Sequence, residues 1–159
     1  MAELDELDKA LLRELQRDGR RTNRELAAAT GVSPSTSLER VRGLRERGVI
    51  RGFLLDVDLA EIGRPVQALI ALRVHPPKRQ VIEAFREWVA LLPETVGVFV
   101  VSGGEDFLVH VAVPDNDALY AFVIDRLTQR PEVADVRTSV VYEHIRSRVI
   151  EPTETRKRR

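Results

Sequence analysis

The sequence predicts an α+β fold in two parts, an N-terminal helix-turn-helix and a C-terminal β-α-β-β-α-β domain of the ferredoxin-like type. Two patterns in the 159 residues lead to this prediction. Over residues 4–50, apolar side chains recur at three- and four-residue steps, as they do in amphipathic helices. From residue 65 onward, runs of β-branched and aliphatic residues alternate with helical patterns, as in a domain that packs helices on a sheet.

The composition excludes several classes of protein. The chain has 25 basic and 25 acidic residues, so it is not basic throughout, as a general nucleic-acid coat would be. Cysteine is absent, which excludes disulfides, thiolate metal sites and cysteine nucleophiles. The apolar runs are too short to cross a membrane, and the acidic start lacks the pattern of a signal peptide. We therefore expect a cytoplasmic protein without a membrane partner.

Three short helices are expected before residue 50. Residues 4–15 form the first, on the spacing of their leucines, and Gly19 marks its end. The second begins at Thr22, where Glu25 completes a capping box. Ser33-Pro34 opens the third, with serine as the cap and proline at the first helical position. The tight turn between the last two helices makes a helix-turn-helix pattern.

Basic residues gather in one part of this neutral chain. Residues 20–51 carry eight basic and three acidic side chains, whereas residues 1–19 carry three basic and six acidic ones. Such an island indicates an anionic partner, although an arginine-rich face that only meets solvent would look the same. Because the island includes the third helix, the pattern favours DNA binding over a three-helix bundle whose arginines are merely solvated.

The third helix has an apolar side and a polar side. Leu38, Val41 and Leu44 are expected to face the core. The opposite side would present hydroxyl and guanidinium groups to base edges and phosphates. The residues expected there, with Ser37 at the edge, are Thr36, Arg40 and Arg47. Residues 49–55 then favour a short strand pair or wing.

The second half is expected to fold as a sheet with two helices. Its apolar pattern predicts strands at 66–74, 95–101, 107–113 and 133–142, and helices at 81–92 and 115–127. Because the helices can cover only one side of the sheet, an apolar second side would be exposed in a monomer. This points to association between copies of the chain.

Nothing in the residue chemistry indicates an enzyme, a metal site or a cofactor. The three histidines, His75, His110 and His144, have no partner at metal-ligand spacing. The turn at 102–106 is different, since Ser102-Gly103-Gly104-Glu105-Asp106 combines backbone N–H groups with carboxylates, as binding of a zwitterion would require. Thr138 could add a hydroxyl. Spacing alone nevertheless favours a plain glycine turn that connects two strands.

Four stretches of the chain, taken together, resemble the Lrp/AsnC family of leucine- and asparagine-responsive transcription regulators. They are Leu-Asp-Glu-Leu-Asp at 4–8, Asp-Gly-Arg-Arg-Thr-Asn-Arg-Glu-Leu-Ala at 18–27, the segment 31–50 from Gly-Val-Ser-Pro-Ser to Gly-Val-Ile, and Val-Ser-Gly-Gly-Glu-Asp-Phe at 101–107. The resemblance runs from Leu4 to about Arg146. It implies a sequence-specific regulator with a winged helix-turn-helix and a ligand-sensing domain, found in the cytoplasm and associated with the nucleoid.

The resemblance also implies the partners and the boundaries. The partners are double-stranded DNA, an amino acid or related small molecule bound between sensing domains, and a second copy of the chain, in dimers that assemble further to tetramers or octamers. The boundaries are 1–52 for the winged helix-turn-helix, 53–64 for a linker strand, 65–148 for the ferredoxin-like sensing domain and 149–159 for a basic tail expected to be disordered.

The residues that the resemblance assigns to function form two sets. The recognition helix is 35–47, and its expected DNA contacts are Ser35, Thr36, Ser37, Arg40, Arg42, Arg45 and Arg47. The expected effector contacts are Ser102, Gly103, Gly104, Glu105, Asp106 and Thr138.

This sequence departs from the family pattern at two of its positions. Where many relatives have the first of two threonines on the last strand, it has Val136, and Gly43 stands where a basic residue is common. The loss of a hydroxyl changes which ligand can be satisfied in a polar site. Two rival functions stay open, an architectural DNA-wrapping protein without an effector and a decarboxylase of modified tetrapyrroles, which the scattered histidines disfavour.

Overall fold

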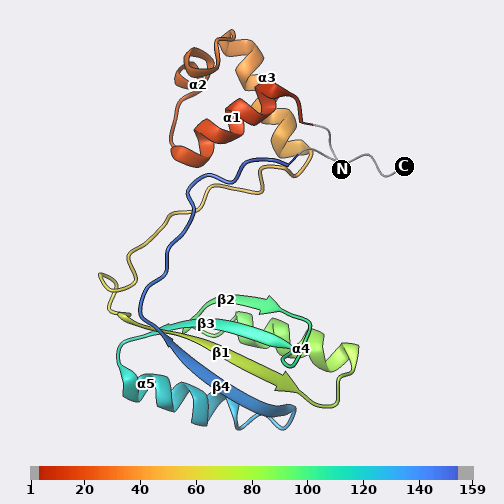
Figure 1. Cartoon of the computed structure of the whole chain (residues 1–159), viewed down its shortest axis with the longest axis vertical. Coiled ribbons are helices and arrows are strands. Elements are labelled where there is room, and N and C mark those ends of the chain that lie inside the picture. Colours follow the sequence, from red (N-terminus) through yellow and green to blue (C-terminus); the bar gives the residue numbers. More distant parts are fainter. Residues whose placement is uncertain (1–3, 154–159) are drawn as a thin grey trace. The chain divides into compact units, whose positions relative to one another are not determined.

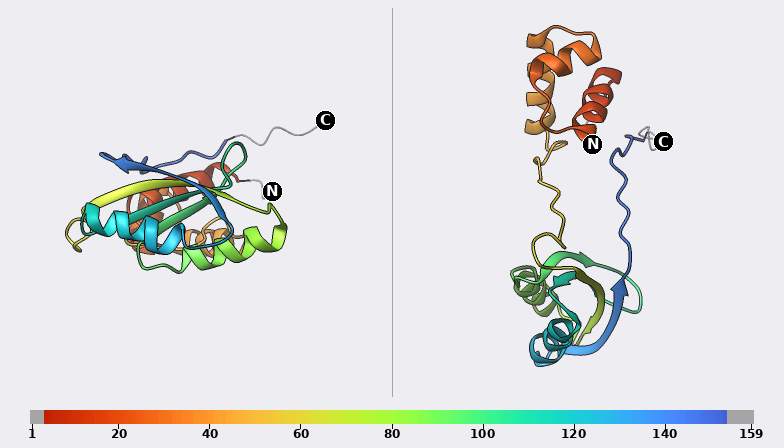
Figure 2. Two further views of the ribbon diagram at one scale, coloured as in Figure 1. Left: turned by 90° about the horizontal axis from the view of Figure 1, so that it is seen from below. Right: turned by 90° about the vertical axis from the view of Figure 1, so that its left-hand side faces the viewer.

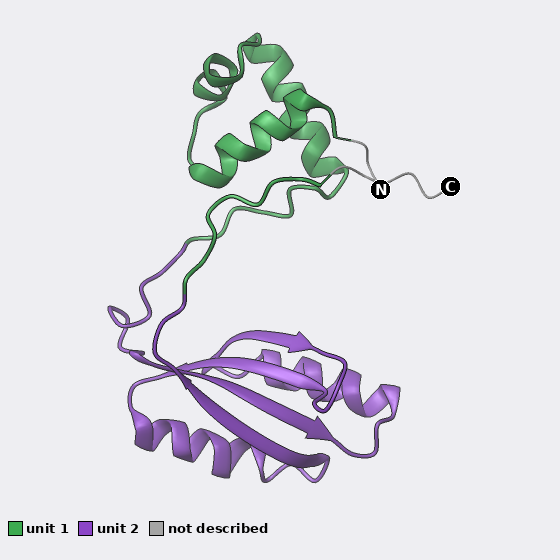
Figure 3. Ribbon diagram, in the orientation of Figure 1, with its two compact units in different colours: residues 1–55, 145–159 green, residues 56–144 purple. Residues whose placement is uncertain are grey.

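The structure is a computed structural model that describes residues 4–153 (Figure 1). The chain divides into two compact units (Figure 3). The first, which we call the helical unit, comprises residues 1–55 and 145–159, and the second, the sheet unit, comprises residues 56–144. The division lies at 55/56 and again at 144/145, so it differs by a few residues from the boundaries expected at 52 and 148.

Three helices form the helical unit, as the sequence predicts: α1 (Glu6–Arg17), α2 (Asn23–Thr30) and α3 (Pro34–Glu46). Each begins at a polar cap. The Asp5 carboxylate accepts the N–H of Asp8 at 2.8 Å. Thr22 and Glu25 make the reciprocal bonds of a capping box, and Ser33 Oγ accepts the N–H of Thr36 at 3.1 Å. These caps satisfy N–H groups that a helix leaves without internal partners.

The core of the helical unit is small and made of leucines. Leu11 and Leu44 are fully buried, and Leu15 and Leu26 are nearly so. Val41 of α3 packs partly buried against this cluster. The three-helix arrangement is therefore held by apolar contact between α1, α2 and the inner side of α3.

The inner side of α3 includes Val41 and Leu44, as predicted, but differs from the prediction at Ser37 and Leu38. Ser37 is fully buried, whereas Leu38, expected in the core, is 60% exposed. Residues turn by about 100° each along a helix, so Ser37, Val41 and Leu44 at i, i+4 and i+7 form the buried stripe. The prediction that Ser37 contacts DNA is therefore wrong, because no side of its hydroxyl reaches the surface.

The predicted strand pair or wing at 49–55 is also wrong, because no strand occurs in this segment. The N–H groups of Val49 and Ile50 both donate to the carbonyl of Leu44, at 2.9 and 3.1 Å, and so complete the end of α3. Residues 53–58, the first part of the expected linker strand, have no strand partner either. Leu54 is consequently 98% exposed.

Part of the expected tail belongs to the helical unit. Arg13 of α1 donates to the Glu151 carboxylate through two nitrogens, at 2.6 and 3.0 Å. The Gln16 amide exchanges hydrogen bonds with the backbone of Ile150, at 2.9 and 3.1 Å. Residues 150 and 151 are thus tied to α1, which differs from the expected disordered tail, and residues 154–159 of that tail lie outside the described residues.

The sheet unit has the predicted β-α-β-β-α-β order. Its elements are β1 (Val66–Val74), α4 (Arg79–Ala90), β2 (Thr95–Val100), β3 (Phe107–Val113), α5 (Asn116–Ala121), which continues as a π-helical segment η1 (Phe122–Leu127), and β4 (Val133–Val141). The four strands form one antiparallel sheet in the order β2-β3-β1-β4. This is the ferredoxin-like topology, so the predicted fold of this half is confirmed.

Helices α4 and α5 both lie on one face of the sheet (Figure 2). The residues of β1 and β3 on that face, among them Ile70, Leu72, Phe107 and Val109, are fully buried. Phe85 of α4 packs on Phe107 with ring centroids 4.9 Å apart. The opposite face, which we call the uncovered face, carries no helix of this unit. Within residues 4–153, no helix is long and apolar enough to span a membrane.

Candidate DNA-binding and ligand-binding sites

The turn between α2 and α3 is fixed by local bonds. Gly31 ends α2 in the left-handed conformation, with φ of 71°, which glycine adopts without the strain a side chain would bring. The Val32 N–H then donates to the Ala27 carbonyl at 3.0 Å. The Asn23 amide donates to the Pro34 carbonyl at 2.6 Å. The angle at which α3 leaves α2 is therefore set by residues on both helices.

Hydroxyl groups gather at the N-terminus of α3. Ser33 Oγ lies 2.9 Å from Ser35 Oγ and 2.8 Å from Thr36 Oγ1. Ser35 is exposed and Thr36 is half-buried. The structure thus places these two predicted DNA contacts together, at the end of the helix that enters the groove in proteins of this architecture.

Arg40 and Arg47 point back to α1 rather than outward. Arg40 donates to the Asp5 carboxylate at 2.5 Å and to Asp8 at 3.4 Å, and Arg47 donates to the other oxygen of Asp8 at 2.8 Å. The Asp5 carboxylate holds the pKa of Arg40 above its ordinary value. The N–H of Asp8, with help from Arg40, lowers the pKa of Asp5 below its ordinary 3.8. The guanidiniums of these two arginines are therefore engaged within the unit.

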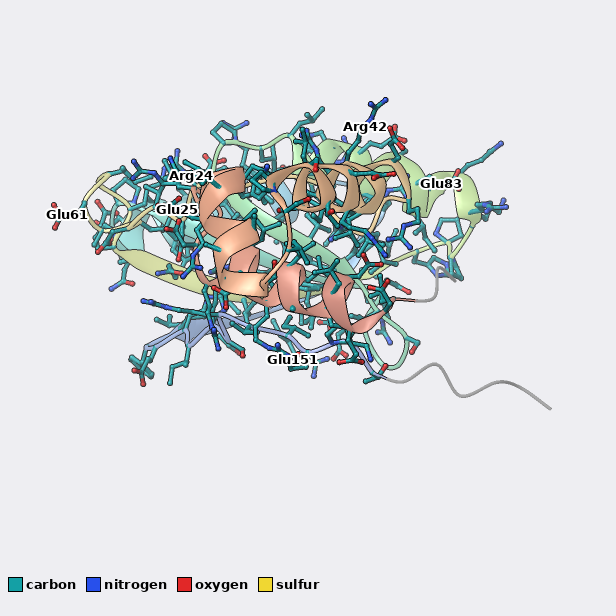
Figure 4. The ribbon with its side chains drawn as sticks, turned by 90° about the horizontal axis from the view of Figure 1, so that it is seen from above. Arg24, Glu25, Arg42, Glu61, Glu83 and Glu151 are labelled. Carbon is teal, nitrogen blue, oxygen red and sulfur yellow. The ribbon has the colours of Figure 1, made fainter. Side chains whose placement is uncertain are left out.

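The surface that faces away from the core is what we call the outer face of α3. On this face, Arg42 has a side chain that is 78% exposed and extends away from the helix (Figure 4). Its Nε donates to Glu46 one turn later at 2.7 Å. The members of the outer face are Ser35, Leu38, Glu39, Arg42, Arg45 and Glu46. Sequence reasoning missed Leu38 and Glu39, although a helical wheel centred on Ser37 would have placed them there.

The turn at 102–106 joins β2 to β3 and is anchored by Asp106. The Asp106 N–H donates to the Leu72 carbonyl at 2.9 Å, and its carboxylate accepts the Val74 N–H at 2.8 Å. Asp106 therefore holds the turn against the end of β1, and one of its two oxygens is already occupied. Gly103 has φ of 132°, which favours glycine, and an added Cβ would meet no atom within 4 Å at Gly103 or Gly104.

The other carboxylate of the turn reaches β4. Glu105 forms an ion pair with Arg137, whose side chain is 61% exposed. Thr138 pairs across the ladder with the buried Ile70, so its side chain lies on the helix-covered face, whereas Arg137 pairs with Ala71 and lies on the uncovered face. Glu105 is thus bonded to β4 and Asp106 to the end of β1, and Thr138 lies on the other face of the sheet. No local signal selects Arg137, because its partner Glu105 lies 32 positions away along the chain.

The uncovered face carries apolar side chains in register. Phe99, Leu108 and Ala71 lie side by side on β2, β3 and β1. Phe99 is 59% exposed and Leu69, one row away, is 38% exposed. Next to Leu69, His110 lies 2.9 Å from the Gln67 amide oxygen. Within residues 4–153, no group of three histidine or acidic residues is placed to hold a metal ion.

Comparisons with known proteins agree with both halves of this arrangement. Residues 4–45 match the AsnC-type helix-turn-helix domain, and residues 67–150 match the Lrp/AsnC ligand binding domain. The chain is 39% identical over 145 residues to the HTH-type transcriptional regulator AldR of Mycobacterium tuberculosis, covering 91% of this chain and 81% of the relative. It is 34% identical to the leucine-responsive regulatory protein of Escherichia coli K12, covering 91% and 88%.

Solved structures show the same likeness. A transcriptional regulator of Neisseria meningitidis, crystallised in complex with L-Met, superimposes with a TM-score of 0.84 at 30% identity, covering 91% of this chain and 94% of that one. The crystal structure of AldR from M. tuberculosis gives a TM-score of 0.72 at 34% identity, covering 91% and 98%. These relatives are transcriptional regulators and not enzymes. The chain is a DNA-binding transcriptional regulator with a ligand-binding domain, and it belongs to the Lrp/AsnC family.

Proposed function

We propose that the chain binds specific sites in double-stranded DNA through α3 and that a small molecule in the sheet unit controls this binding. The observation that carries the proposal is the outer face of α3, where Arg42 and Arg45 stand clear of the core on a helix fixed by the turn before it. Ser35 and Thr36 add hydroxyls at its N-terminus. Arg40 and Arg47, held by Asp5 and Asp8, set the orientation of α3.

For the small molecule we propose an amino acid or a related metabolite, bound at the turn 102–106. The backbone N–H groups of residues 102–105 donate to no acceptor in the described part of the chain, which suits a carboxylate. The remaining oxygen of Asp106 suits an ammonium group, and Glu105, although paired with Arg137, adds a second carboxylate to the same turn. The L-Met complex of the Neisseria relative supports this ligand class. Thr138, on the other face of β4, is the least supported of the proposed contacts.

We propose that the active form is a homodimer, which assembles further to tetramers or octamers on the chromosome in the cytoplasm. The row of Phe99, Leu108 and Ala71 supports association through the uncovered face, because exposed apolar side chains in register favour burial against a like surface. A two-fold dimer reads a roughly palindromic site. A ligand alters DNA binding only if it prefers one arrangement of the assembly over another.

A fluorescence-anisotropy titration of the whole protein tests the proposal. The DNA upstream of its own gene is compared with scrambled DNA of equal length, at two salt concentrations, with and without each amino acid. We expect binding at least about a hundredfold tighter to the upstream DNA and a shift with one amino acid. Equal and strongly salt-dependent binding to both DNAs would contradict sequence-specific regulation. A complete absence of binding at low salt would overturn the DNA-binding function itself.

A further inference from the structure

The outer face of α3 offers fewer groups for reading bases than its sequence suggests. Ser37 is buried, and the guanidiniums of Arg40 and Arg47 are bonded to carboxylates of α1. Arg42 is paired with Glu46 along the helix. Three side chains on the outer face remain exposed with no polar contact to the described residues, namely Leu38, Glu39 and Arg45, and the first two lie in the N-terminal half of α3. This half contacts base edges when a helix-turn-helix enters the major groove.

Leu38 is an apolar side chain that is largely exposed to water, which is unfavourable for an apolar group. It is 60% exposed, between Ser35 and Arg42 on the helix surface. The one apolar group that the major groove offers is the C5-methyl of thymine. Contact with that methyl would remove apolar surface from water on both partners. Leu38 therefore matches thymine by its chemistry.

Glu39 is a carboxylate on a surface that approaches phosphates. The DNA backbone repels a carboxylate there, and a hydrogen bond accepted from a base offsets this cost only at the matching sequence. In the major groove, glutamate typically accepts a hydrogen bond from the N4 amino group of cytosine. Glu39 follows Leu38 directly, a rise of about 1.5 Å along the helix, which is less than the spacing of about 3.4 Å between base pairs. The two side chains therefore reach the same or neighbouring base pairs.

We propose that Leu38 and Glu39 are the specificity-determining pair of α3 and that they select a thymine methyl and a cytosine amino group within each half-site. This inference rests on the proposed function, since it names the bases that the same helix reads. Arg42 and Arg45 then supply phosphate contacts that carry affinity but little sequence information. Leu38 and Glu39 decide which sequences are bound.

The experiment selects bound duplexes from a randomised pool with the whole protein, followed by anisotropy titrations on the selected site. Replacement of the selected thymine by uracil removes only the 5-methyl group, and we expect it to weaken wild-type binding about fourfold. The same replacement should leave L38A unchanged, because that variant no longer contacts the methyl. E39Q should change the preferred base from cytosine to adenine, with about tenfold discrimination, because glutamine pairs with adenine N6 and N7. Leu91→Ala and Glu83→Gln, both in or beside α4, are the matched controls.

The outcomes separate the two proposals. If the wild type selects no site and binds all duplexes equally, the proposed sequence-specific function fails. If it selects a site, but uracil has no effect on the wild type and E39Q keeps the original base preference, the function stands and the assignment of Leu38 and Glu39 is overturned. A changed preference in Leu91→Ala or Glu83→Gln would also contradict the assignment, because those residues lie in the sheet unit.

Discussion

The carboxylate of Asp8 on α1 lies 2.8 Å from a guanidinium nitrogen of Arg47, just beyond the end of α3. Its second oxygen lies 3.4 Å from Arg40, and the Asp8 side chain is almost fully buried. A carboxylate removed from water is stable only when it is paired and hydrogen-bonded. Asp8 therefore joins the first helix of the unit to the recognition helix by its charge.

Replacement of Asp8 by asparagine should destabilise the helical unit. The variant keeps the shape of the side chain but leaves two guanidiniums without their shared carboxylate. We expect the free energy of unfolding to fall by about 2 kcal/mol. Breaking a fully buried pair typically costs about 3–5 kcal/mol, and the loss is smaller here because both arginines reach water. Urea unfolding followed by helical circular dichroism measures it, with Glu46→Gln as the control for an exposed pair. An unchanged midpoint would show that Asp8 does not hold α3.

Loss of Arg42 or Arg45 should reduce the salt dependence of DNA binding. Each phosphate contact contributes about one unit to the slope of log K against log salt concentration, so each alanine variant should lower the slope by about one. Arg47→Ala should leave the slope nearly unchanged, because its guanidinium is bonded to Asp8. Anisotropy titrations at four salt concentrations give the slopes. An equal decrease for Arg47→Ala would show that Arg47 releases Asp8 and binds phosphate.

Alanine in place of Gly43 should stabilise α3. A Cβ added at this position meets no atom within 4 Å, and Gly43 lies inside the helix. Alanine is favoured over glycine there by about 1 kcal/mol. Gly43→Lys should, in addition, tighten DNA binding at low salt by restoring a basic side chain near the phosphates. Thermal unfolding and anisotropy measure the two effects, and a lower melting temperature for Gly43→Ala would contradict the open space beside it.

Asp106→Ala should disturb the sheet unit as well as the proposed ligand site. The N–H of Val74 would lose its acceptor, which costs about 1–3 kcal/mol when the group stays out of water. Ser102→Ala, on the exposed part of the same turn, is the matched variant that leaves this bond intact. Calorimetry of both variants gives the stability, and anisotropy with the effective amino acid gives the response. An Asp106→Ala protein with wild-type stability and wild-type response would rule out both roles.

The capping box of α2 should make stability depend on pH. The backbone N–H of Thr22, followed by its hydroxyl, lowers the pKa of Glu25 below its ordinary 4.5. A lowered pKa means that the charged form is favoured by folding, so the contribution is complete above 4.5 and disappears as the pH falls through the lower value. The difference in melting temperature between wild type and Glu25→Gln should therefore shrink on acidification below 4.5. A difference that stays constant with pH for Glu25→Gln would contradict the argument.

Local signals in the sequence were sufficient for most of the fold. Ser33-Pro34 and the pair Thr22 and Glu25 act within four residues, so the starts of α2 and α3 could be predicted from them alone. The strands of the sheet unit could be predicted because their apolar runs are bounded by prolines and glycines. The phase of α3 could not, since Ser37 is polar by type and only its close packing makes it part of the core.

The site could be predicted in part. The turn at 102–106 was recognisable from its glycines and carboxylates, but the bond from Val74 to Asp106 joins residues 32 positions apart. The engagement of Arg40 by Asp5 spans 35 positions, and that of Arg13 by Glu151 spans 138. A count of basic residues in the sequence does not distinguish these arginines from Arg42. Only the tertiary structure shows which guanidiniums are already occupied.

The helical unit is assembled from two separated stretches of the chain, because residues 145–153 return to α1 after the whole sheet unit has been traced. During synthesis, the end of α3 therefore leaves the ribosome about a hundred residues before the segment that supplies Ile150 and Glu151. The nascent chain therefore contains α3 early. The bonds from α1 to Ile150 and Glu151 form only after the whole sheet unit has been synthesised. A fragment ending at residue 55 would correspond to that early intermediate and not to the finished unit.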